Sequence, residues 1–315
     1  MILALAGGVG GARLACGLAL ALAPGELAVA VNVGDDFEHL GLSISPDLDT
    51  VMYTLAGIQN PETGWGRAGE TWHFMETLAR LGGESWFRLG DHDLAVHVER
   101  TRRLRGGEAL SAITSSFCAR LGIAHAVVPV TDAPLRTMVN TDAGELCFQD
   151  YFVRRRCEPM VTGFRFEGAD TAGPSAPLAR LLEPGAIQGV VICPSNPWLS
   201  VAPMLAVARL RALLESKRVP VVAVSPIVAG NAVKGPAAKI MRELGIEASA
   251  LGVARHYGTL VDGWVIDTQD AALEPAIASG ARSVALTDTM MISPDKSLHA
   301  ASEALSLMRR IAETR

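Results

Sequence analysis

The sequence predicts a Rossmann-like, doubly wound α/β fold with a mainly parallel sheet and a smaller, inserted β-rich subdomain. Apolar runs typical of strands alternate with helical stretches in both halves of the chain. The strands are almost continuously apolar, as in a parallel sheet that helices cover on both faces. A central segment instead alternates polar and apolar residues, as antiparallel strands do.

The N-terminal end is typical of a βαβ unit. Residues 2–6 form an apolar run that predicts a buried strand, and four glycines follow within residues 7–11. A helix is expected over residues 12–23, because proline and glycine come directly after it. A second strand is expected over residues 27–33 and a short helix over residues 50–55.

The second half repeats the pattern of strand followed by helix. Its first two predicted strands end in loops that carry serine and proline. Strands are expected over residues 187–193, 219–224, 264–267 and 283–286, and helices over residues 203–216, 236–244 and 297–313.

The middle of the chain differs from both ends. Alternating patterns predict antiparallel strands over residues 126–130, 136–140, 145–154 and 162–167. A stretch rich in Gly, Pro and Ala then leads back to α/β character. We therefore expect a core of residues 1–129 and 176–315, and an inserted β-rich subdomain of residues 130–175.

Composition excludes several classes of protein. The chain has 315 residues, 49% of them apolar, so it can bury a large core and is not disordered throughout. Its 28 Lys and Arg residues against 33 Asp and Glu residues give a net charge of −5 and form no basic run, which argues against a nucleic-acid partner. The longest apolar stretch is about half of the roughly 20 residues that cross a membrane, so no membrane partner is expected.

The N-terminus and the cysteines favour a cytoplasmic protein. The Ala-rich first 25 residues lack the basic start of a secretory signal, and glycines and Arg13 interrupt their apolar part. The five cysteines are scattered and form no C-x-x-C pair, which argues against disulfides and structural zinc. A homodimer is the default expectation for its assembly.

The glycine-rich turn is the first candidate for chemistry. Glycines between a strand and a helix let backbone N–H groups approach an anion at the helix N-terminus. The dinucleotide fingerprint is incomplete, since Arg13 stands where its third glycine belongs, and no G-K-[ST] follows. The alternative is a tight turn that binds nothing. The candidates for phosphate binding are Gly7, Gly8, Gly10, Gly11 and Arg13.

Four aspartates form the second candidate. Asp35 and Asp36 follow the second predicted strand, at the edge where open α/β sheets bind ligands. Asp47 and Asp49, two residues apart, would share a face in an extended segment and point at one cation. Carboxylates beside a phosphate repel one another unless a divalent ion lies among them, and Mg²⁺ suits such oxygen ligands. The alternative is that Asp49 caps a helix and that Asp35 and Asp36 only form a turn.

Two further groups carry weaker signals. Residues 86–93, with His97 and Arg100 on the next helix, could bind a metal or an anion, or their aspartates could cap that helix. Ser195 and Asn196 lie between two prolines at a strand end and could hydrogen-bond a base, a ribose or a phosphate. Lys234, before a predicted helix, is a candidate phosphate contact. Plain turns are the alternative for both loops.

Seven blocks of the sequence carry a resemblance to a known family. They are LAGGVGGARLACGL, VNVGDDFEHLGLSISPDLDTVMYTLAG, GWGRAGETW, WFRLGDHDLAVHVERT, FQDYFVRRR, PSNPWLS and AVSPIVAGNAVKGPA. In this order they extend over nearly the whole chain, and the long second block is far more specific than the glycines. On these blocks the chain resembles the 2-phospho-L-lactate transferase family (LPPG:Fo transferases) of coenzyme F-420 biosynthesis.

The resemblance implies a Rossmann-like core and a smaller subdomain that helps to hold the deazaflavin Fo. It also implies transfer of a phospho-carboxylate unit from a guanylyl-activated donor to the ribityl hydroxyl of Fo, with release of GMP and with the help of Mg²⁺. The unit is of the phospholactate, phosphoenolpyruvate or phosphoglycerate type, and the sequence does not decide among them.

This chemistry requires alignment and charge neutralisation more than a covalent nucleophile, because a neutral alcohol attacks and a nucleotide phosphate leaves. The aspartates are therefore assigned to Mg²⁺ and to orienting the hydroxyl: Asp35, Asp36, Asp47 and Asp49 as metal ligands, with Asp35, Asp36 and Asp49 as catalytic residues. The glycines with Arg13, Ser195, Asn196 and Lys234 are assigned to the donor, and Thr50, Trp86, Asp91 and His97 to the deazaflavin.

Two other functions compete with this one. A non-catalytic relative that binds a nucleotide sugar and regulates metabolism would share the first loop and an acidic strand end, but the PDLDTVMYTLAG and GETW blocks are associated with the transferases. An NAD(P)-dependent oxidoreductase would need a glycine at Arg13.

Overall fold

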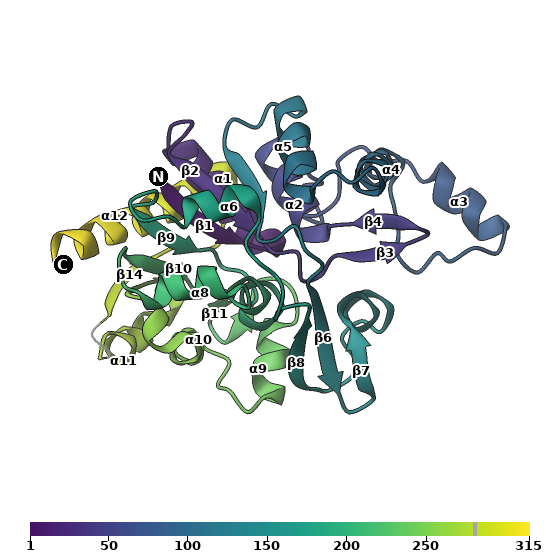
Figure 1. Cartoon of the computed structure of the whole chain (residues 1–315). Coiled ribbons are helices and arrows are strands. Elements are labelled where there is room, and N and C mark those ends of the chain that lie inside the picture. Colours follow the sequence, from purple (N-terminus) through teal and green to yellow (C-terminus); the bar gives the residue numbers. More distant parts are fainter. Residues whose placement is uncertain (280–281) are drawn as a thin grey trace.

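Seven parallel strands form the central sheet, in the order β14-β13-β10-β9-β1-β2-β5 (Figure 1). The computed structural model describes residues 1–279 and 282–315. Every residue of the five inner strands β13, β10, β9, β1 and β2 is buried, which agrees with the apolar runs of the sequence. The seven strands are β1 (Ile2–Ala6), β2 (Leu27–Val31), β5 (Ala126–Pro129), β9 (Gly189–Ile192), β10 (Val221–Val224), β13 (Gly263–Asp267) and β14 (Ser283–Thr287).

The predicted α/β fold is confirmed, and the order of the strands fixes where a ligand can bind. The chain runs outward from β1 to β2 and β5, then returns to β9 on the other side of β1 and continues outward to β14. The carboxyl ends of β1 and β9 therefore lie side by side at a switch point, where open sheets of this kind bind ligands.

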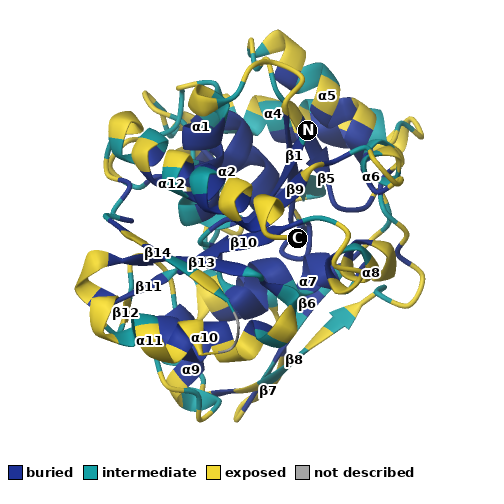
Figure 2. Cartoon of the chain, turned by 90° about the vertical axis from the view of Figure 1, so that its left-hand side faces the viewer, coloured by how far each residue is buried: buried dark blue, intermediate teal, exposed yellow. Residues whose placement is uncertain are grey.

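Helices cover both faces of the sheet (Figure 2). Helix α1 (Gly8–Ala21) packs against α2 (Pro46–Leu55) and α12 (Pro294–Glu313) on one face. The opposite face carries α6 (Ala176–Leu181), α8 (Ala208–Glu215), α10 (Ala250–Tyr257) and α11 (Glu274–Ala278).

Several predicted boundaries shift. Helix α1 begins at Gly8, so most of the glycine-rich turn is the first turn of a helix. The helix expected over residues 203–216 is broken, because it begins as a π-helix, Pro197–Val201, and continues as α7 (Ala202–Leu205) and α8. The remaining short elements are β11 (Ile227–Val228), β12 (Asn231–Ala232), α9 (Ala237–Glu243) and two 3-10 helices, Gly258–Leu260 and Thr268–Leu273.

The middle of the chain forms a three-stranded antiparallel sheet, in the order β7-β6-β8. Two expectations for it are wrong. Residues 126–129 are β5, which pairs in parallel with β2 in the core sheet, and residues 145–154 are not one strand, because β7 ends at Cys147 and a π-helix, Asp150–Arg154, follows. The three strands are β6 (Arg136–Thr141), β7 (Gly144–Cys147) and β8 (Val161–Glu167).

A further group of elements lies at the right of Figure 1. It contains the hairpin of β3 (Phe37–His39) and β4 (Leu42–Ile44), with α3 (His73–Arg80) and α4 (Asp91–Arg105), and α5 (Leu110–Arg120) connects it to the core. The sequence analysis did not predict this hairpin. Ile44, Met75 and Leu89 form a small apolar cluster of their own.

Helices α3 and α4 cap each other. Glu70, before α3, accepts hydrogen bonds from the backbone N–H groups of His92 and Asp93 at the start of α4. Asp91, the first residue of α4, accepts hydrogen bonds from the backbone N–H groups of His73 and Phe74 at the start of α3. Each carboxylate satisfies N–H groups that have no partner within their own helix.

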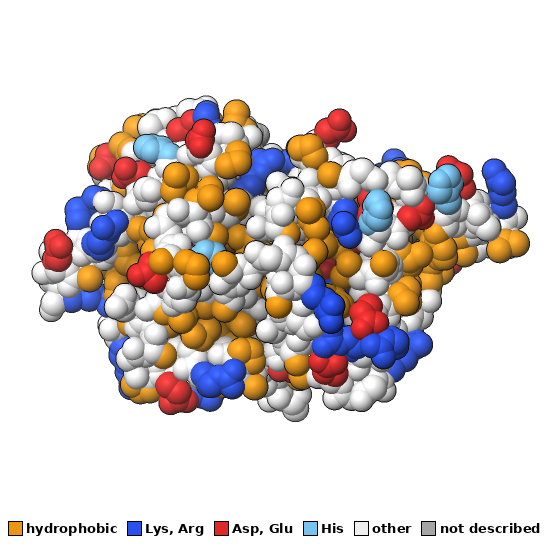
Figure 3. Space-filling view, turned by 90° about the horizontal axis from the view of Figure 1, so that it is seen from above, with side chains coloured by type: hydrophobic (Ala, Val, Ile, Leu, Met, Phe, Trp, Pro, Cys, Tyr) orange, Lys and Arg blue, Asp and Glu red, His pale blue; other side chains and the backbone are white. Residues whose placement is uncertain are grey.

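No single helix in the described residues is long and apolar enough to cross a membrane, and only the pair Pro197–Leu205 and Ala208–Glu215, bent by 95°, reaches that length and composition together. On the face seen in Figure 3, acidic and basic side chains are interspersed with hydrophobic ones.

Candidate active site

A cavity of about 470 Å³ opens at the carboxyl edge of the sheet, where β1 and β9 end. Eight separate segments of the chain line it. The predicted residues among them are Gly7, Gly8, Gly10, Asp35, Asp47, Asp49, Thr50, Trp86, His97, Ser195, Asn196 and Lys234. Four predicted residues, Gly11, Arg13, Asp36 and Asp91, are not in its lining.

The glycine-rich turn fits closely against the loop after β9. Gly7 N–H donates to Ser195 Oγ at 3.0 Å, and a Cβ atom at Gly10 would clash with the carbonyl oxygen of Pro194. Only glycine allows this approach, so the backbone N–H groups that begin α1 lie directly on the cavity.

The prediction that Asp47 and Asp49 share an extended segment is wrong. Helix α2 begins at Pro46, so both aspartates lie in its first turn and their side chains reach different partners. Asp47 accepts hydrogen bonds from Gly8 N–H at 2.6 Å and from Asn32 Nδ2 at 3.0 Å. Asn32 Nδ2 also donates to Asp35 Oδ1 at 3.1 Å, so one amide joins Asp35 to Asp47.

Asp35 and Asp47 are both buried and share the Asn32 amide. Burial raises the pKa of Asp47 to about 6. Burial, and then the charges of Asp47 and Asp36, hold the pKa of Asp35 well above its ordinary value. Two buried carboxylates with raised pKa values are stabilised by a positive charge between them, and their oxygens are the ligands that Mg²⁺ prefers. These two residues therefore fit a magnesium ion.

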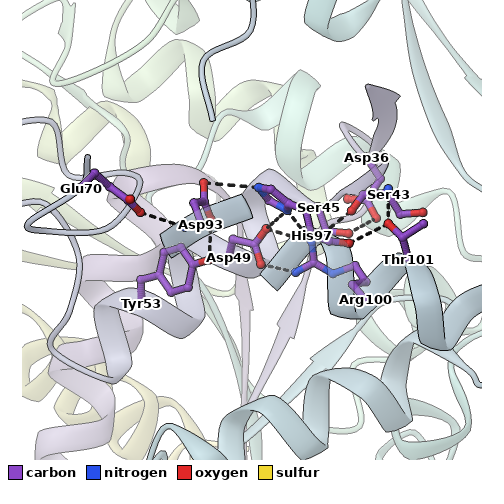
Figure 4. Close-up of polar contacts among 10 residues, drawn as sticks. All are labelled: Asp36, Ser43, Ser45, Asp49, Tyr53, Glu70, Asp93, His97, Arg100 and Thr101. Atoms are coloured by element: carbon purple, nitrogen blue, oxygen red, sulfur yellow. Dashed lines mark hydrogen bonds and ion pairs between the residues drawn. The ribbon is translucent and has the colours of Figure 1, made fainter. Parts of the chain in front are cut away.

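The other two aspartates have partners of their own. Asp36 accepts a hydrogen bond from Ser45 Oγ at 2.8 Å, and burial raises its pKa to about 7. Both oxygens of Asp49 accept hydrogen bonds from Arg100, whose side chain is only 1% exposed (Figure 4). The four aspartates thus do not form a single cluster.

A second polar cluster extends from Arg100 along α4 (Figure 4). Arg100 Nη1 lies 3.2 Å from His97 Nδ1, and His97 Nε2 lies 3.3 Å from Asp93 Oδ2. Asp93 Oδ1 accepts a hydrogen bond from Tyr53 OH at 2.5 Å. Asp49, Asp93 and His97 bring one ligand atom each within 4.8 Å of one another, which is close enough to hold a metal ion.

The remaining predicted residues have clear structural partners. The Asn196 side chain caps the π-helix that follows it by accepting from Trp198 and Leu199 N–H, and Lys234 Nζ donates to the carbonyl oxygen of Thr63. Burial, and then the charge of Arg13, lower the pKa of Lys234, so two positive charges lie near the start of α1. Asp91 caps α3, as described above.

Sequence reasoning missed one wall of the cavity. Phe148, Gln149, Phe152 and Val153 line it from the segment after β7. The rings of Phe148 and Phe152 stack with 5.3 Å between their centroids. Trp65 and Arg88 also line the cavity. The FQDYFVRRR block contains this wall, but its strand-like pattern concealed the π-helix that places the aromatic rings together.

Comparisons with known proteins decide the family. A family model described as 2-phospho-L-lactate transferase CofD matches residues 2–301, which is most of the chain. The chain belongs to the CofD family. The resemblance described from the sequence is therefore confirmed, and CofD membership makes the protein a transferase.

Curated relatives of this CofD chain are named phosphoenolpyruvate transferase. One from Streptomyces griseus is 41% identical over 98% of this chain and 99% of its own length. Another, from Streptomyces coelicolor, is 40% identical over 99% of both chains. A crystal structure of a upf0052 family member from Bacillus halodurans has a TM-score of 0.54 and 14% identity, covers 95% of this chain and 89% of its own, and agrees in fold.

Proposed function

We propose that this protein transfers a phosphoenolpyruvate-type unit from a guanylyl-diphosphate donor to the ribityl hydroxyl of the deazaflavin Fo and releases GMP, in coenzyme F-420 biosynthesis. The observation that carries this proposal is the pair of buried carboxylates, Asp35 and Asp47, beside the first N–H groups of α1 in one cavity. Relatives that are 37–42% identical are named phosphoenolpyruvate transferase, which favours that unit over phospholactate.

Asp35 and Asp47 are the proposed magnesium ligands, with Asn32 orienting both carboxylates. When bound, Mg²⁺ would supply positive charge against the diphosphate of the donor. Asp49 is not part of this set, because Arg100 occupies both of its oxygens. Asp36 is not part of it either, because it lies outside the cavity lining and accepts a hydrogen bond from Ser45.

The donor and the acceptor are proposed to occupy opposite ends of the cavity. At one end, Gly7, Gly8 and Gly10 offer backbone N–H groups for phosphate, and Ser195, Asn196 and Lys234 line the same region. At the other end, aromatic side chains suit a flat ring such as a deazaflavin. The residues proposed for it are Tyr53, Trp86, Phe87, Phe148 and Phe152, which line the cavity together with Thr50 and His97.

The proposed reaction balances without a covalent enzyme intermediate. The ribityl oxygen forms a bond to the phosphorus that carries the enolpyruvyl group, the bond from that phosphorus to the guanylyl phosphate breaks, and GMP leaves with the electron pair. The hydroxyl proton must be taken up by a base. Catalysis then rests on alignment and on charge stabilisation.

The test is product formation from defined substrates. Purified protein is incubated with Fo and with donors that carry enolpyruvate, lactate or glycerate, with Mg²⁺ or with EDTA, and the products are identified by mass. We expect the enolpyruvyl product, dependence on Mg²⁺, and a loss of at least about tenfold in kcat for Asp35→Asn and Asp47→Asn, which is roughly 1.4 kcal/mol. Tight binding of a nucleotide sugar with no product from any donor would replace this proposal with a regulatory function.

A further inference from the structure

Asp93 differs from every other carboxylate of the cavity. It lies in the first turn of α4, and its side chain is 18% exposed and lines the cavity. Tyr53 OH holds its Oδ1, and Glu70 accepts the backbone N–H of Asp93 at 2.9 Å. These contacts fix the carboxylate and leave Oδ2 facing His97.

The tautomer of His97 follows from its neighbours. Arg100 Nη1 lies 3.2 Å from His97 Nδ1, and a guanidinium can only donate, so Nδ1 accepts. The ring proton is then on Nε2, 3.3 Å from Asp93 Oδ2. Arg100 thereby orients His97, and His97 in turn faces Asp93.

Asp93 is also the carboxylate of this group whose Oδ2 receives no hydrogen bond from the described residues, because His97 Nε2, 3.3 Å away, makes none. Burial acts to raise its pKa, but His97, Tyr53 and Arg100 outweigh burial, and the net pKa lies below the ordinary value. The pKa of Asp49 is raised by burial in spite of Arg100, and both Asp49 oxygens are occupied.

We propose that Asp93 Oδ2 accepts the proton of the attacking hydroxyl, with His97 and Tyr53 as positioning residues. This inference rests on the proposed function and names its base. The O–H bond of the acceptor breaks as its oxygen bonds to phosphorus, the proton moves to Asp93 Oδ2, and GMP leaves with the electron pair. In protein kinases an aspartate likewise accepts the proton of the substrate hydroxyl during phosphoryl transfer.

The same geometry would suit a metal ion held by Asp49, Asp93 and His97. The charge balance favours the proton instead. Arg100 already compensates Asp49, so a divalent cation there would meet a positive charge that is buried beside it. Metal binding by these three residues is nevertheless an outcome that the experiment must detect.

The experiment compares Asp93→Asn with Glu99→Gln, a carboxylate on the same helix that is 43% exposed, pairs with Arg102 and does not line the cavity. We expect Asp93→Asn to lower kcat about 100-fold or more, while Fo still binds with a Kd within about threefold of wild type by fluorescence titration. Glu99→Gln should keep the wild-type kcat, and Asp93→Glu should recover part of the activity. Tyr53→Phe should lose less than Asp93→Asn, because it removes only a positioning contact.

Each other outcome overturns the assignment. If Asp93→Asn keeps the wild-type kcat, Asp93 is not the base. If the substitution changes only the Kd for Fo, Asp93 is a binding residue. Loss of a bound Mn²⁺ from Asp93→Asn, counted by paramagnetic resonance, makes it a metal ligand. Turnover by the wild-type protein tests the proposed function, whereas the ratio of the Asp93→Asn kcat to the wild-type kcat tests the base, so the two proposals can fail separately. If the wild-type protein forms no product, both proposals fail.

Discussion

Four buried aspartates and the partly exposed Asp93, in or beside one cavity, are kept in different states by their individual contacts. Asp35, Asp36 and Asp47 have raised pKa values because burial disfavours their charge. Asp93 has a lowered pKa because His97 and Tyr53 outweigh burial. Residues of one type, adjacent in space, can therefore perform different tasks in one reaction.

Asp36 provides a prediction for stability against pH. In the unfolded chain its pKa is near 3.8 and in the folded protein about 7, so the folded state binds more protons between these values. Its contribution to the free energy of unfolding is thus fully present below about pH 4 and is lost as the pH rises to about 7. Asparagine does not ionise, so Asp36→Asn should not lose this contribution as the pH rises. The free energy of unfolding of Asp36→Asn minus that of the wild type should therefore increase by about 1–3 kcal/mol from pH 5 to pH 8.

Urea unfolding in EDTA at both pH values measures this difference. The exposed Asp170→Asn is the control and should follow the wild type at both. Parallel curves for Asp36→Asn and wild type would mean that Asp36 is already ionised in the fold at pH 5.

Most single residues of the site could be named from the sequence, but their pairing could not. The aspartates and glycines follow strand ends, which the pattern predicts. The pairing of Asp49 with Arg100 joins residues 51 positions apart and depends on how α4 packs. Pro46 at the start of α2 was the missed local signal, since proline favours the first helical position.

At the scale of elements, the close packing of α1 on α12 depends on one glycine. A Cβ atom at Gly17 would clash with the backbone carbonyl of Ser297, which cannot rotate away as a side chain could. Gly17→Ala should therefore push the two helices apart and lower the free energy of unfolding by about 1–3 kcal/mol. The melting temperature of Gly17→Ala, compared with that of the wild type, measures this loss of stability.

Gly173→Ala is the matched control, because open space surrounds the added methyl group. An unchanged melting temperature in Gly17→Ala would show that α12 can shift without loss of packing.

The types of long, regular elements were predictable, and short irregular ones were not. The strands of the core sheet are buried at every residue, so they appear in the sequence as short, continuous apolar runs. The π-helices Asp150–Arg154 and Pro197–Val201 leave no such periodicity and depend on packing against the rest of the chain. The mutual capping of α3 and α4 likewise joins residues about 20 positions apart.

At the scale of the whole molecule, the path of the chain places the cavity. The chain returns to pair β9 with β1 only after more than half of its length, and the cavity lies where these two strands end. Gly7, Asp47, Asp93, Gln149 and Ser195 come from segments that are far apart in the sequence and line one space. The βαβ pattern predicts the edge where they meet, whereas the wall at Phe148 and Phe152 depends on tertiary packing. The division into a core and the segment 130–175 remains a prediction.

One helix of the core fastens the antiparallel sheet. On α9, Glu243 accepts a hydrogen bond from Val161 N–H at 3.0 Å, and Lys239 Nζ donates to the carbonyl oxygen of Pro159 at 3.0 Å. Glu243→Ala should leave the Val161 N–H without this acceptor. We expect hydrogen exchange to become at least about fivefold faster in residues 159–163 and to stay unchanged in β1 and β9.

Glu215→Ala, which breaks an exposed ion pair with Arg211, is the control and should change neither region. Equal acceleration in β1 and β9 would instead mean that the antiparallel sheet and the core open as one unit.

The hydrogen bond from Gly8 N–H to Asp47 has a consequence for ligand entry. The Asp47 carboxylate takes the place at the start of α1 that an anion would fill, so a side chain of the protein itself neutralises the helix end. A phosphate that binds these N–H groups would have to displace the Asp47 carboxylate from Gly8 N–H. Its affinity is then set by what receives the displaced carboxylate, so we expect an anionic ligand to bind there more tightly when a cation can pair with Asp47.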